Sequence, residues 1–400
     1  MRAAFMPVAF GYGTTARCLA VARELQRRGH ESVFLAGAAV GPMIERNGFA
    51  FRAIPDVRIS GNARQSPAHQ LFAQESTPGF LAHQMEAVVE ALRQTHADLL
   101  VYSNSLTAAV AASIVGKPSI SIFAPSILEV PSLGFFVPML RTWLASVALR
   151  RRVRSRLTTP IYSAFLGDRS FVPSIPPLIY WPLLVPPDLI GHRSEVVPVG
   201  ALLAQAPADL PPDGVLLDEL GVKGRPFVYA TLGGEIFDLE MIRAIAEGIR
   251  HAECHGLVSG GHRVTDEVSQ RLSDEQVQVV HYLPDDFRAI KTADLLIWHG
   301  GHQTMLEAVA VGTPAIGLPY QLDQFANVAS LVSYGAAQRL SARRVSTGMI
   351  DRAIRTMLHN PRYAERMTAL RDINRDYRGA AAIADVVVEL TQGMRAWPDE

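Results

Sequence analysis

The chain has 400 residues, of which 48% are hydrophobic and 19% are charged, and its 38 basic side chains balance 38 acidic ones. This length predicts two domains, the hydrophobic content excludes a disordered chain, and the zero net charge argues against a general affinity for nucleic acid. The two cysteines, Cys18 and Cys254, lie too far apart in sequence for a disulfide framework or a zinc cluster. No apolar run reaches the roughly 18 residues that cross a bilayer, so we expect a cytoplasmic protein without stable membrane insertion.

The N-terminal half alternates short apolar runs with amphipathic patterns, which is typical of a parallel sheet with covering helices. Gly29 ends the first predicted helix. The predicted strands cover residues 3–10, 31–35, 98–102 and 119–123, and the predicted helices cover residues 15–28 and 106–115, with a glycine turn at 11–13.

Residues 125–187 break this rhythm. They are rich in proline and aromatic residues, and they carry an arginine cluster at residues 150–156. An ordinary amphipathic helix with a solvated basic end, a helix on an anionic membrane surface and the wall of an apolar pocket all fit this pattern.

A second series of strands and helices follows a proline-marked, irregular stretch that we interpret as a linker. Two such halves predict an α/β fold with two facing Rossmann-like, doubly wound domains. Ligands of open parallel sheets bind at the carboxyl ends of the strands, so the interdomain cleft is the expected site. The predicted strands cover residues 227–232, 256–258, 277–281, 295–298 and 315–318, and the predicted helix between the first two covers residues 239–249.

The most informative motif is a His-Gly-Gly turn, His299-Gly300-Gly301, between a predicted strand and a predicted helix. Its glycines let a ligand approach the backbone closely, and the N–H groups of a first helical turn attract an anion. His299 and Thr304 can add side-chain donors to a diphosphate. Glu307, one helical turn after Thr304, can accept hydrogen bonds from a ribose diol.

The pair Asp323-Gln324 follows the next predicted strand, where it would reach the hydroxyl groups of a sugar. The pattern H-x-G-x-x-T-x-x-E followed by D-Q resembles the donor signature of the GT-B glycosyltransferase family that includes plant UDP-sugar transferases and bacterial antibiotic glycosyltransferases. The resemblance covers most of the chain. It implies an acceptor-binding N-terminal domain and a C-terminal domain that binds a nucleotide sugar.

The resemblance implies a role for each part of the donor signature. His299 and Thr304 would bind the diphosphate, Glu307 the ribose, and the turn after residue 231 would approach the phosphates. His302 would contact either donor or acceptor. The donor-binding residues implied in this way are Thr231, Gly233, Gly234, Tyr282, Leu283, His299, Gly300, Gly301, His302, Gln303, Thr304, Glu307, Asp323 and Gln324.

The resemblance also implies a division of the chain into a domain over residues 1–200, a linker over 201–224 and a domain over 225–379. The remaining residues, 380–400, would include a helix that packs back on the first domain. Because acceptors bind to the N-terminal domain in this family, we favour an apolar acceptor pocket for the segment with the arginine cluster.

The resemblance implies an inverting transferase that needs no metal ion and no cofactor beyond the nucleotide sugar. The chain agrees in lacking a D-x-D motif, which clamps a metal and a diphosphate in the other main transferase class. The expected partners are a UDP- or dTDP-sugar donor and a hydrophobic small-molecule acceptor such as a natural-product aglycone. A homodimer is left open.

The chain departs from the family at the first turn, where a histidine base usually follows the glycine. Thr14 occupies that position, after Tyr12 and Gly13, and Asn104 lies where the acidic partner of the histidine is expected. Threonine cannot act as a base at neutral pH. Either Asp168 or Asp323 serves as the base, or the acceptor needs little deprotonation, or the protein binds the sugar nucleotide without turnover.

The first turn also fits the G-x-G-x-x-G/A fingerprint of dinucleotide-binding proteins, which makes an NAD-dependent oxidoreductase an alternative. That fingerprint requires an acidic residue at the end of the second strand to bind ribose. The second predicted strand instead runs into residues 36–39, which are alanine and glycine. We therefore favour the glycosyltransferase interpretation.

Overall fold

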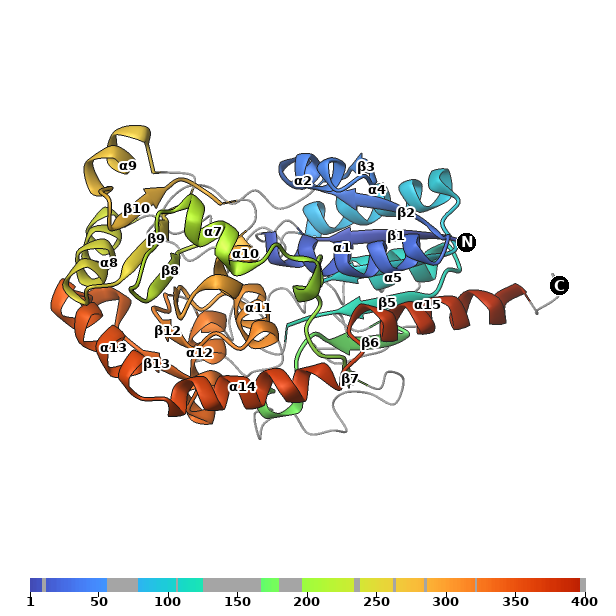
Figure 1. Ribbon diagram of the computed structural model, residues 1–400. Helices are drawn as coiled ribbons and strands as arrows, with labels where there is room; N and C mark the ends of the chain where they lie inside the picture. Colours follow the sequence, from blue (N-terminus) through green and yellow to red (C-terminus); the bar gives the residue numbers. More distant parts are fainter. Residues whose placement is uncertain are drawn as a thin grey trace. The chain divides into compact units, whose positions relative to one another are not determined.

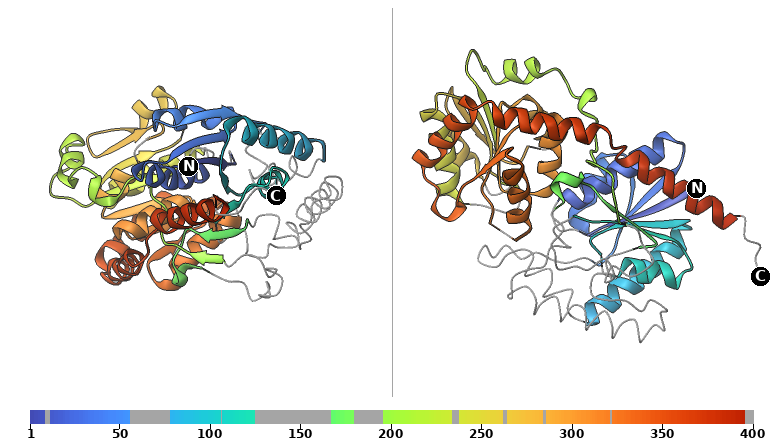
Figure 2. Two further views of the ribbon diagram at one scale, coloured as in Figure 1. Left: turned by 90° about the vertical axis from the view of Figure 1, so that its right-hand side faces the viewer. Right: turned by 90° about the horizontal axis from the view of Figure 1, so that it is seen from below.

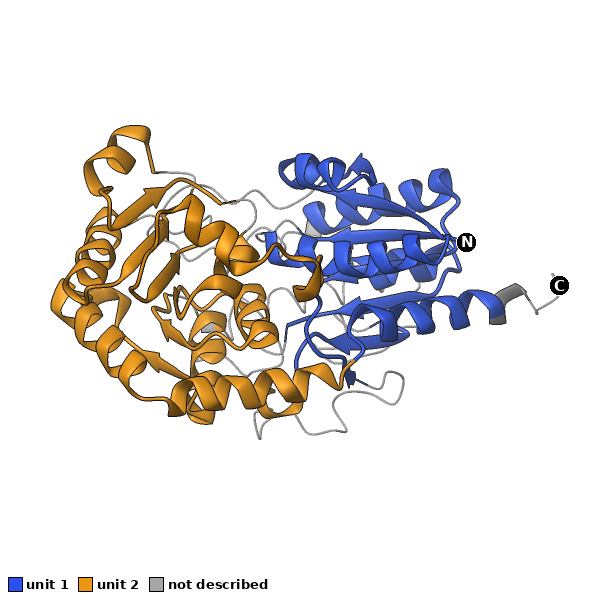
Figure 3. Cartoon of the chain, viewed as in Figure 1, with its two compact units in different colours: residues 1–174, 181–204, 378–400 blue, residues 175–180, 205–377 orange. Residues whose placement is uncertain are grey.

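The protein is described from a computed structural model. It describes residues 1–8, 12–55, 78–105, 107–124, 167–179, 196–233, 238–261, 264–283, 286–320 and 322–395. The chain forms two compact units, each with its own parallel sheet (Figure 3). Unit 1 comprises residues 1–174, 181–204 and 378–400, and unit 2 comprises residues 175–180 and 205–377. The two parallel sheets confirm the predicted α/β class.

Unit 1 is built on a seven-stranded sheet with the order β3-β2-β1-β4-β5-β6-β7 (Figure 1). Its central strands are buried on both faces, as in parallel sheets that are covered on both sides. The strands are β1 (Arg2–Pro7), β2 (Glu31–Ala36), β3 (Ala50–Ala53), β4 (Leu99–Ser103), β5 (Ser119–Ile122), β6 (Arg169–Val172) and β7 (Val196–Pro198).

Helices cover both faces of the unit 1 sheet. Because side chains alternate along a strand, Phe5 of β1 enters one core with α1 and α15, whereas Met6 enters the other core with α4 and α5. The helices of this unit are α1 (Tyr12–Arg27), α2 (Gly41–Arg46), α4 (Pro78–Thr95), α5 (Ala108–Ile114) and α15 (Ala380–Arg395), with a 3-10 turn at Ala38–Val40.

The last helix, α15, packs against α1 although the two are more than 350 residues apart (Figure 2). Its buried side chains Ile383, Ala384 and Val387 complete the core that contains Phe5. This packing supplies most of the attachment, because burial of apolar area is the main stabilising contribution.

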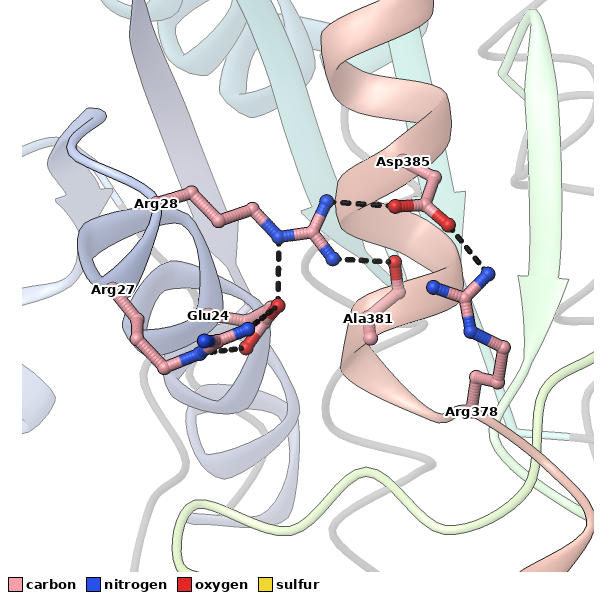
Figure 4. Close-up of polar contacts among 6 residues, drawn as sticks. All are labelled: Glu24, Arg27, Arg28, Arg378, Ala381 and Asp385. Atoms are coloured by element: carbon pink, nitrogen blue, oxygen red, sulfur yellow. Dashed lines mark hydrogen bonds and ion pairs between the residues drawn. The ribbon is translucent and has the colours of Figure 1, made fainter.

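A chain of charged side chains connects the ends of this helix pair (Figure 4). Arg28, the residue directly after α1, bonds Asp385 of α15 and Glu24 of α1, both at 2.7 Å. Arg378 reaches the other oxygen of Asp385 at 2.6 Å. The hydrogen bond from Arg28 lowers the pKa of Asp385, and the bond from Arg27 lowers the pKa of Glu24.

Unit 2 is built on a six-stranded parallel sheet with the order β10-β9-β8-β11-β12-β13. This is the doubly wound order, in which the chain runs outward first in one direction and then in the other. The switch point therefore lies between β8 and β11. The strands are β8 (Phe227–Thr231), β9 (His255–Ser259), β10 (Val277–Val280), β11 (Leu295–Trp298), β12 (Ala315–Gly317) and β13 (Ala337–Arg339).

The helices α8 and α13 cover the face of this sheet to which Val228 and Ala230 of β8 point. The α-helices of unit 2 are α7 (Asp213–Glu219), α8 (Leu239–His251), α9 (Asp266–Leu272), α10 (Asp286–Thr292), α11 (His302–Val311), α12 (Leu322–Tyr334), α13 (Thr347–His359) and α14 (Arg362–Arg375). Short 3-10 turns lie at Pro176–Leu178, Pro207–Asp209 and Ala342–Arg344.

The stretch that the sequence analysis assigns to a linker, residues 201–224, is part of the units instead. Residues 205–224 belong to unit 2, and α7 within them packs against α10. Lys291 of α10 bonds Asp213 at 2.9 Å, and Arg288 bonds Glu219 at 3.2 Å. The proline-marked composition of this stretch concealed a two-turn helix that is held by its neighbour.

Candidate functional site

The carboxyl edge of the unit 2 sheet brings together most of the donor-binding residues implied by the resemblance. Thr231 ends β8 and His299 directly follows β11, so the two residues flank the switch point of the sheet. Parallel pairing of the two strands sets Trp298 beside Thr231. This edge is where open α/β sheets bind their ligands.

The His299 ring lies between two glycines. A Cβ atom built on Gly233 would stand 2.9 Å from Cε1 of the ring, and one built on Gly301 would stand 2.6 Å from Nε2. Any side chain at either position would therefore displace the ring. The backbone of Thr231 makes a hydrogen bond to His299 and fixes the ring further.

Burial lowers the pKa of His299 to about 4, and the hydrogen bond from the ring to Thr231 only partly opposes this shift. The imidazole is therefore neutral at pH 7. Its Nδ1 atom is buried and has no hydrogen-bond partner within the described part of the chain. In the neutral ring the single proton lies on the nitrogen that bonds Thr231, so the unpartnered Nδ1 is a hydrogen-bond acceptor.

The helix α11 starts immediately after this ring. Gly301 is its N-cap residue and provides no side-chain cap, and the first helical hydrogen bond runs from the Met305 N–H to the Gly301 carbonyl at 3.1 Å. The N–H groups ahead of Met305 point out of the helix start and carry its positive dipole end. In the first two turns, Thr304 is buried, and the Gln303 amide donates to Glu307 at 3.1 Å.

The first turn of α12 packs directly against the His-Gly-Gly turn. Gly300 has φ +94°, and a Cβ atom there would lie 2.8 Å from both Cβ and the carbonyl oxygen of Gln324. The Asn327 amide donates to the Gly300 carbonyl at 2.9 Å. Gln324 is thus packed against the His-Gly-Gly turn, and Asp323 is its neighbour in the first turn of α12.

The loop after β10 contains Tyr282 and Leu283 at the far end of the same edge. Ser259, the last residue of β9, donates to the His281 carbonyl at 3.0 Å and accepts from the Leu283 N–H at 3.3 Å. This hydroxyl fixes the loop to the neighbouring strand. Gly234 lies outside the described residues, as do the residues of the arginine cluster.

The carboxyl edge of unit 1 carries the expected acceptor-side residues. The helix α1 begins at Tyr12, so Gly13 and Thr14 lie in its first turn. The predicted glycine turn at residues 11–13 is therefore wrong for Gly13, which is helical and has no positive φ. The Thr14 hydroxyl donates to the Val8 carbonyl at 2.6 Å. Asn104 has φ 59°, and its buried Oδ1 has no partner in the described ranges.

Asp168 lies at the opposite edge of the unit 1 sheet. It precedes β6, and its carboxylate accepts hydrogen bonds from the N–H and the hydroxyl of Ser119 at 2.8 and 3.1 Å. Ser119 is the first residue of β5, so both residues lie at the amino ends of their strands. This geometry gives Asp168 a structural role and does not support its interpretation as a base.

Three polar residues that shape this edge of unit 2 were not predicted from the sequence: Ser259, Asp238 and Tyr320. Asp238 caps α8 by accepting from the Met241 N–H, a pattern that an Asp before an apolar helix indicates. No local signal predicts that the Tyr320 hydroxyl bonds Asp238, which is 82 positions away.

Every described helix is too short or too polar to span a membrane. Within the described ranges, no three His, Cys, Asp or Glu side chains are grouped as a metal site.

The chain is similar to known glycosyltransferases. Residues 242–383 match the glycosyltransferase family 28 C-terminal domain. An uncharacterised glycosyltransferase of Methanopyrus kandleri is 25% identical over 84% of this chain and 91% of its own length. The 4'-demethylrebeccamycin synthase of Lentzea aerocolonigenes is 26% identical over 94% of this chain and 95% of its own.

Solved structures show the same fold over nearly the whole chain. The glycosyltransferase of kitacinnamycin aligns with a TM-score of 0.74 at 19% identity, covering 97% of this chain and 98% of that one. The spinosyn rhamnosyltransferase SpnG aligns with a TM-score of 0.73 at 18% identity, covering 97% of this chain and 100% of its own. SpnG has been solved with thymidine diphosphate and with the spinosyn aglycone.

Proposed function

Because the chain is a glycosyltransferase of GT-B fold with a family 28 C-terminal domain, we propose that it transfers a sugar from a UDP- or dTDP-sugar to a hydrophobic small-molecule acceptor, with inversion and without a metal ion. The observation that carries this proposal is the His299 ring, held between Gly233 and Gly301 at the start of α11. The names of two similar proteins, a rebeccamycin-type synthase and a spinosyn rhamnosyltransferase, support a natural-product acceptor. We keep the cytoplasm as the proposed compartment.

The diphosphate binds at the start of α11 in this proposal. Departure of the nucleoside diphosphate builds negative charge on the phosphate oxygens. The N–H groups of the first helical turn, with His299 and Thr304, supply hydrogen bonds and a positive dipole end at that point. Because His299 is neutral at pH 7, it is not a fixed positive charge, and in this proposal its single ring N–H turns from the Thr231 backbone to the diphosphate when the donor binds.

The rest of the donor follows the carboxyl edge of unit 2 in both directions. Glu307 binds the ribose from the second turn of α11. Asp323 and Gln324, packed against Gly300, bind the transferred sugar. The loop with Tyr282, fastened by Ser259, holds the nucleobase.

The acceptor side requires a route for the proton of the nucleophile. The Thr14 hydroxyl donates to Val8 and is not a base at neutral pH. Of the two carboxylates considered from the sequence, Asp323 is at a ligand-binding edge and Asp168 is not. We therefore propose either that Asp323 takes the proton or that the acceptor is a carboxylate, an amine or an activated aromatic carbon, which needs little deprotonation.

Thr14 and Asn104 occupy the positions of the family's histidine base and its acidic partner. This replacement favours one alternative function, an auxiliary protein that binds a sugar nucleotide without turnover. An NAD-dependent oxidoreductase has less support, because β2 ends at Ala36 and continues into Gly37 without an acidic residue for ribose.

Titration calorimetry with UDP, dTDP, GDP and NAD tests the proposal, on the unmodified chain and on His299→Ala. We expect one nucleoside diphosphate to bind and His299→Ala to weaken it. His359→Ala is the matched control, since this exposed histidine lies on α13 and bonds only its own helix among the contacts described. Binding of NAD alone would refute the proposal, and binding without detectable sugar transfer to any aglycone would favour the auxiliary protein.

A further inference from the structure

Tyr320 joins two loops of the unit 2 edge that lie far apart in sequence. It follows β12, and its hydroxyl donates to Oδ2 of Asp238 at 3.2 Å. Asp238 is the N-cap residue of α8, the helix that follows β8 in the chain. The side chain of Tyr320 is thus anchored to a different helix from the one that its own loop precedes.

Asp238 is itself held in place by its second oxygen. Oδ1 of Asp238 accepts from the Met241 N–H at 3.2 Å, so one carboxylate both caps α8 and accepts the hydrogen bond from Tyr320. Burial, and then the neighbouring Asp238 carboxylate, raises the pKa of Tyr320 to about 12. The phenol therefore keeps its proton at neutral pH and donates it to Asp238.

The backbone of Tyr320 holds the side chain of Gln324. The Tyr320 N–H donates to Oε1 of Gln324 at 2.8 Å, and Gln324 is only 6% exposed. Because that oxygen is bound to the backbone, the orientation of the carboxamide follows the position of Tyr320. Gln324 in turn packs against Gly300, next to His299.

We propose that Tyr320 is a positioning residue for the sugar end of the donor. Held by Asp238, it fixes the Gln324 carboxamide in the orientation that contacts the transferred sugar. The protein thereby distinguishes a sugar nucleotide from the bare nucleoside diphosphate. This inference rests on the proposed function, because it requires a nucleotide sugar at this edge.

The chain offers a matched control at the opposite end of the same edge. Ser259 fastens the loop with Tyr282 and Leu283, which in the proposed function holds the nucleobase. A nucleobase is present in both the bare nucleotide and the sugar nucleotide. Ser259→Ala should therefore weaken both ligands by the same factor, whereas loss of the Tyr320 anchor should weaken only one.

The experiment is calorimetry on the full chain with UDP and UDP-glucose, and with dTDP and dTDP-glucose. Tyr320→Phe removes the hydroxyl and keeps the backbone bond to Gln324. Asp238→Ser keeps an N-cap oxygen but is too short to reach Tyr320. We expect each variant to bind the sugar nucleotide about 5-fold to 10-fold more weakly, as for loss of one hydrogen bond, and the bare nucleotide within about 2-fold of the unmodified chain.

The double variant Tyr320→Phe with Asp238→Ser should bind the sugar nucleotide no more weakly than the weaker-binding single variant, because both changes remove the same hydrogen bond. Equal weakening of both ligands would overturn the inference by assigning Tyr320 a purely structural role. Unchanged binding of both ligands would overturn it as well. If the unmodified chain binds none of the four ligands, the proposed function fails first, and that result is distinct from a failure of the Tyr320 variants alone.

Discussion

The two sheets have different chemistry at the same topological position. In both, the first strand of the unit lies beside the fourth, and the switch point falls between them. In unit 2 this point carries the His299 ring and a helix start without a side-chain cap. In unit 1 the described residues there include a hydroxyl side chain, Thr14, and an amide side chain, Asn104.

This difference separates what the scaffold provides from what the side chains provide. A doubly wound sheet offers a ligand-binding edge wherever it occurs, but the chemistry depends on the residues at that edge. In the proposed function, unit 2 stabilises developing negative charge, whereas Thr14 and Asn104 of unit 1 carry polar groups without charge.

The largest expected effect comes from removing the ring that distinguishes the two edges. His299→Ala should weaken nucleoside diphosphate binding about 10-fold to 100-fold, since hydrogen bonds to charged groups contribute about 1.5–3 kcal/mol. Calorimetry and turnover with the same donor measure this loss. Unchanged affinity for the nucleoside diphosphate, in a variant with an unchanged unfolding temperature, would show that the diphosphate does not bind at His299.

A methyl group beside the ring should act almost as strongly. Gly301→Ala places a Cβ atom 2.6 Å from Nε2 of His299 and must shift the ring, so we expect a roughly 10-fold loss of donor affinity. Gly348→Ala is the control, because nothing lies within 4 Å of its added Cβ and it is in a helix. Equal donor affinity in the two variants would contradict the role of the His299 ring between Gly233 and Gly301.

Thr14→Ala tests the neutral character of the unit 1 edge. The change removes the hydrogen bond to the Val8 carbonyl and should reduce turnover less than 10-fold, with donor affinity unaffected. Initial rates at saturating donor provide the measurement. Abolished turnover in a folded variant would show that this threonine is catalytic.

Acidification should reveal His299 in the stability of the protein. Its pKa is lowered to about 4 in the folded state, so the folded chain disfavours the proton that the unfolded chain takes up below about pH 6.5. The stabilisation present above pH 6.5 is therefore lost as the pH falls toward 4, with a slope of up to about 1.4 kcal/mol per pH unit. The free energy of unfolding, measured with denaturant from pH 7 to 4, should fall less steeply with pH in His299→Gln than in the unmodified chain. An identical dependence on pH would show that His299 is not its cause.

The smallest effect is expected at the charged network between α1 and α15. Asp385→Asn should lower the free energy of unfolding by less than about 1 kcal/mol, since exposed ion pairs contribute little, and should leave nucleotide binding unchanged. Because the pKa of Asp385 is lowered in the folded state, this contribution exists above its ordinary pKa and disappears in acid. A change in donor affinity would show that unit 1 influences the unit 2 edge through α15.

The sequence was sufficient wherever a signal is local. The strand before His299 has the predicted bounds, and the helix after it follows from the glycines and the apolar spacing. The other predicted strands lie within a few residues of observed ones, because buried parallel strands read as short apolar runs, whereas the short strands β3, β6, β7 and β13 were not predicted. The interdomain cleft stays a prediction.

Long-range pairing accounts for most of what the sequence did not predict. The bond between Tyr320 and Asp238 depends on how the two loops pack. Asp168 was a candidate base because its residue type fits, but the edge on which it lies is known only from the sheet. Composition was also misleading at α7, where prolines flank a helix that its neighbour stabilises.

The place of α15 in unit 1 has a consequence for how the chain folds during synthesis. The core around Phe5 needs Ile383, Ala384 and Val387, which leave the ribosome only after the whole of residues 205–377. Multidomain chains generally fold from the N-terminus as they emerge. Here the later unit has all of its residues first, and the earlier unit waits, with one face of its sheet incompletely covered, until the last helix is made.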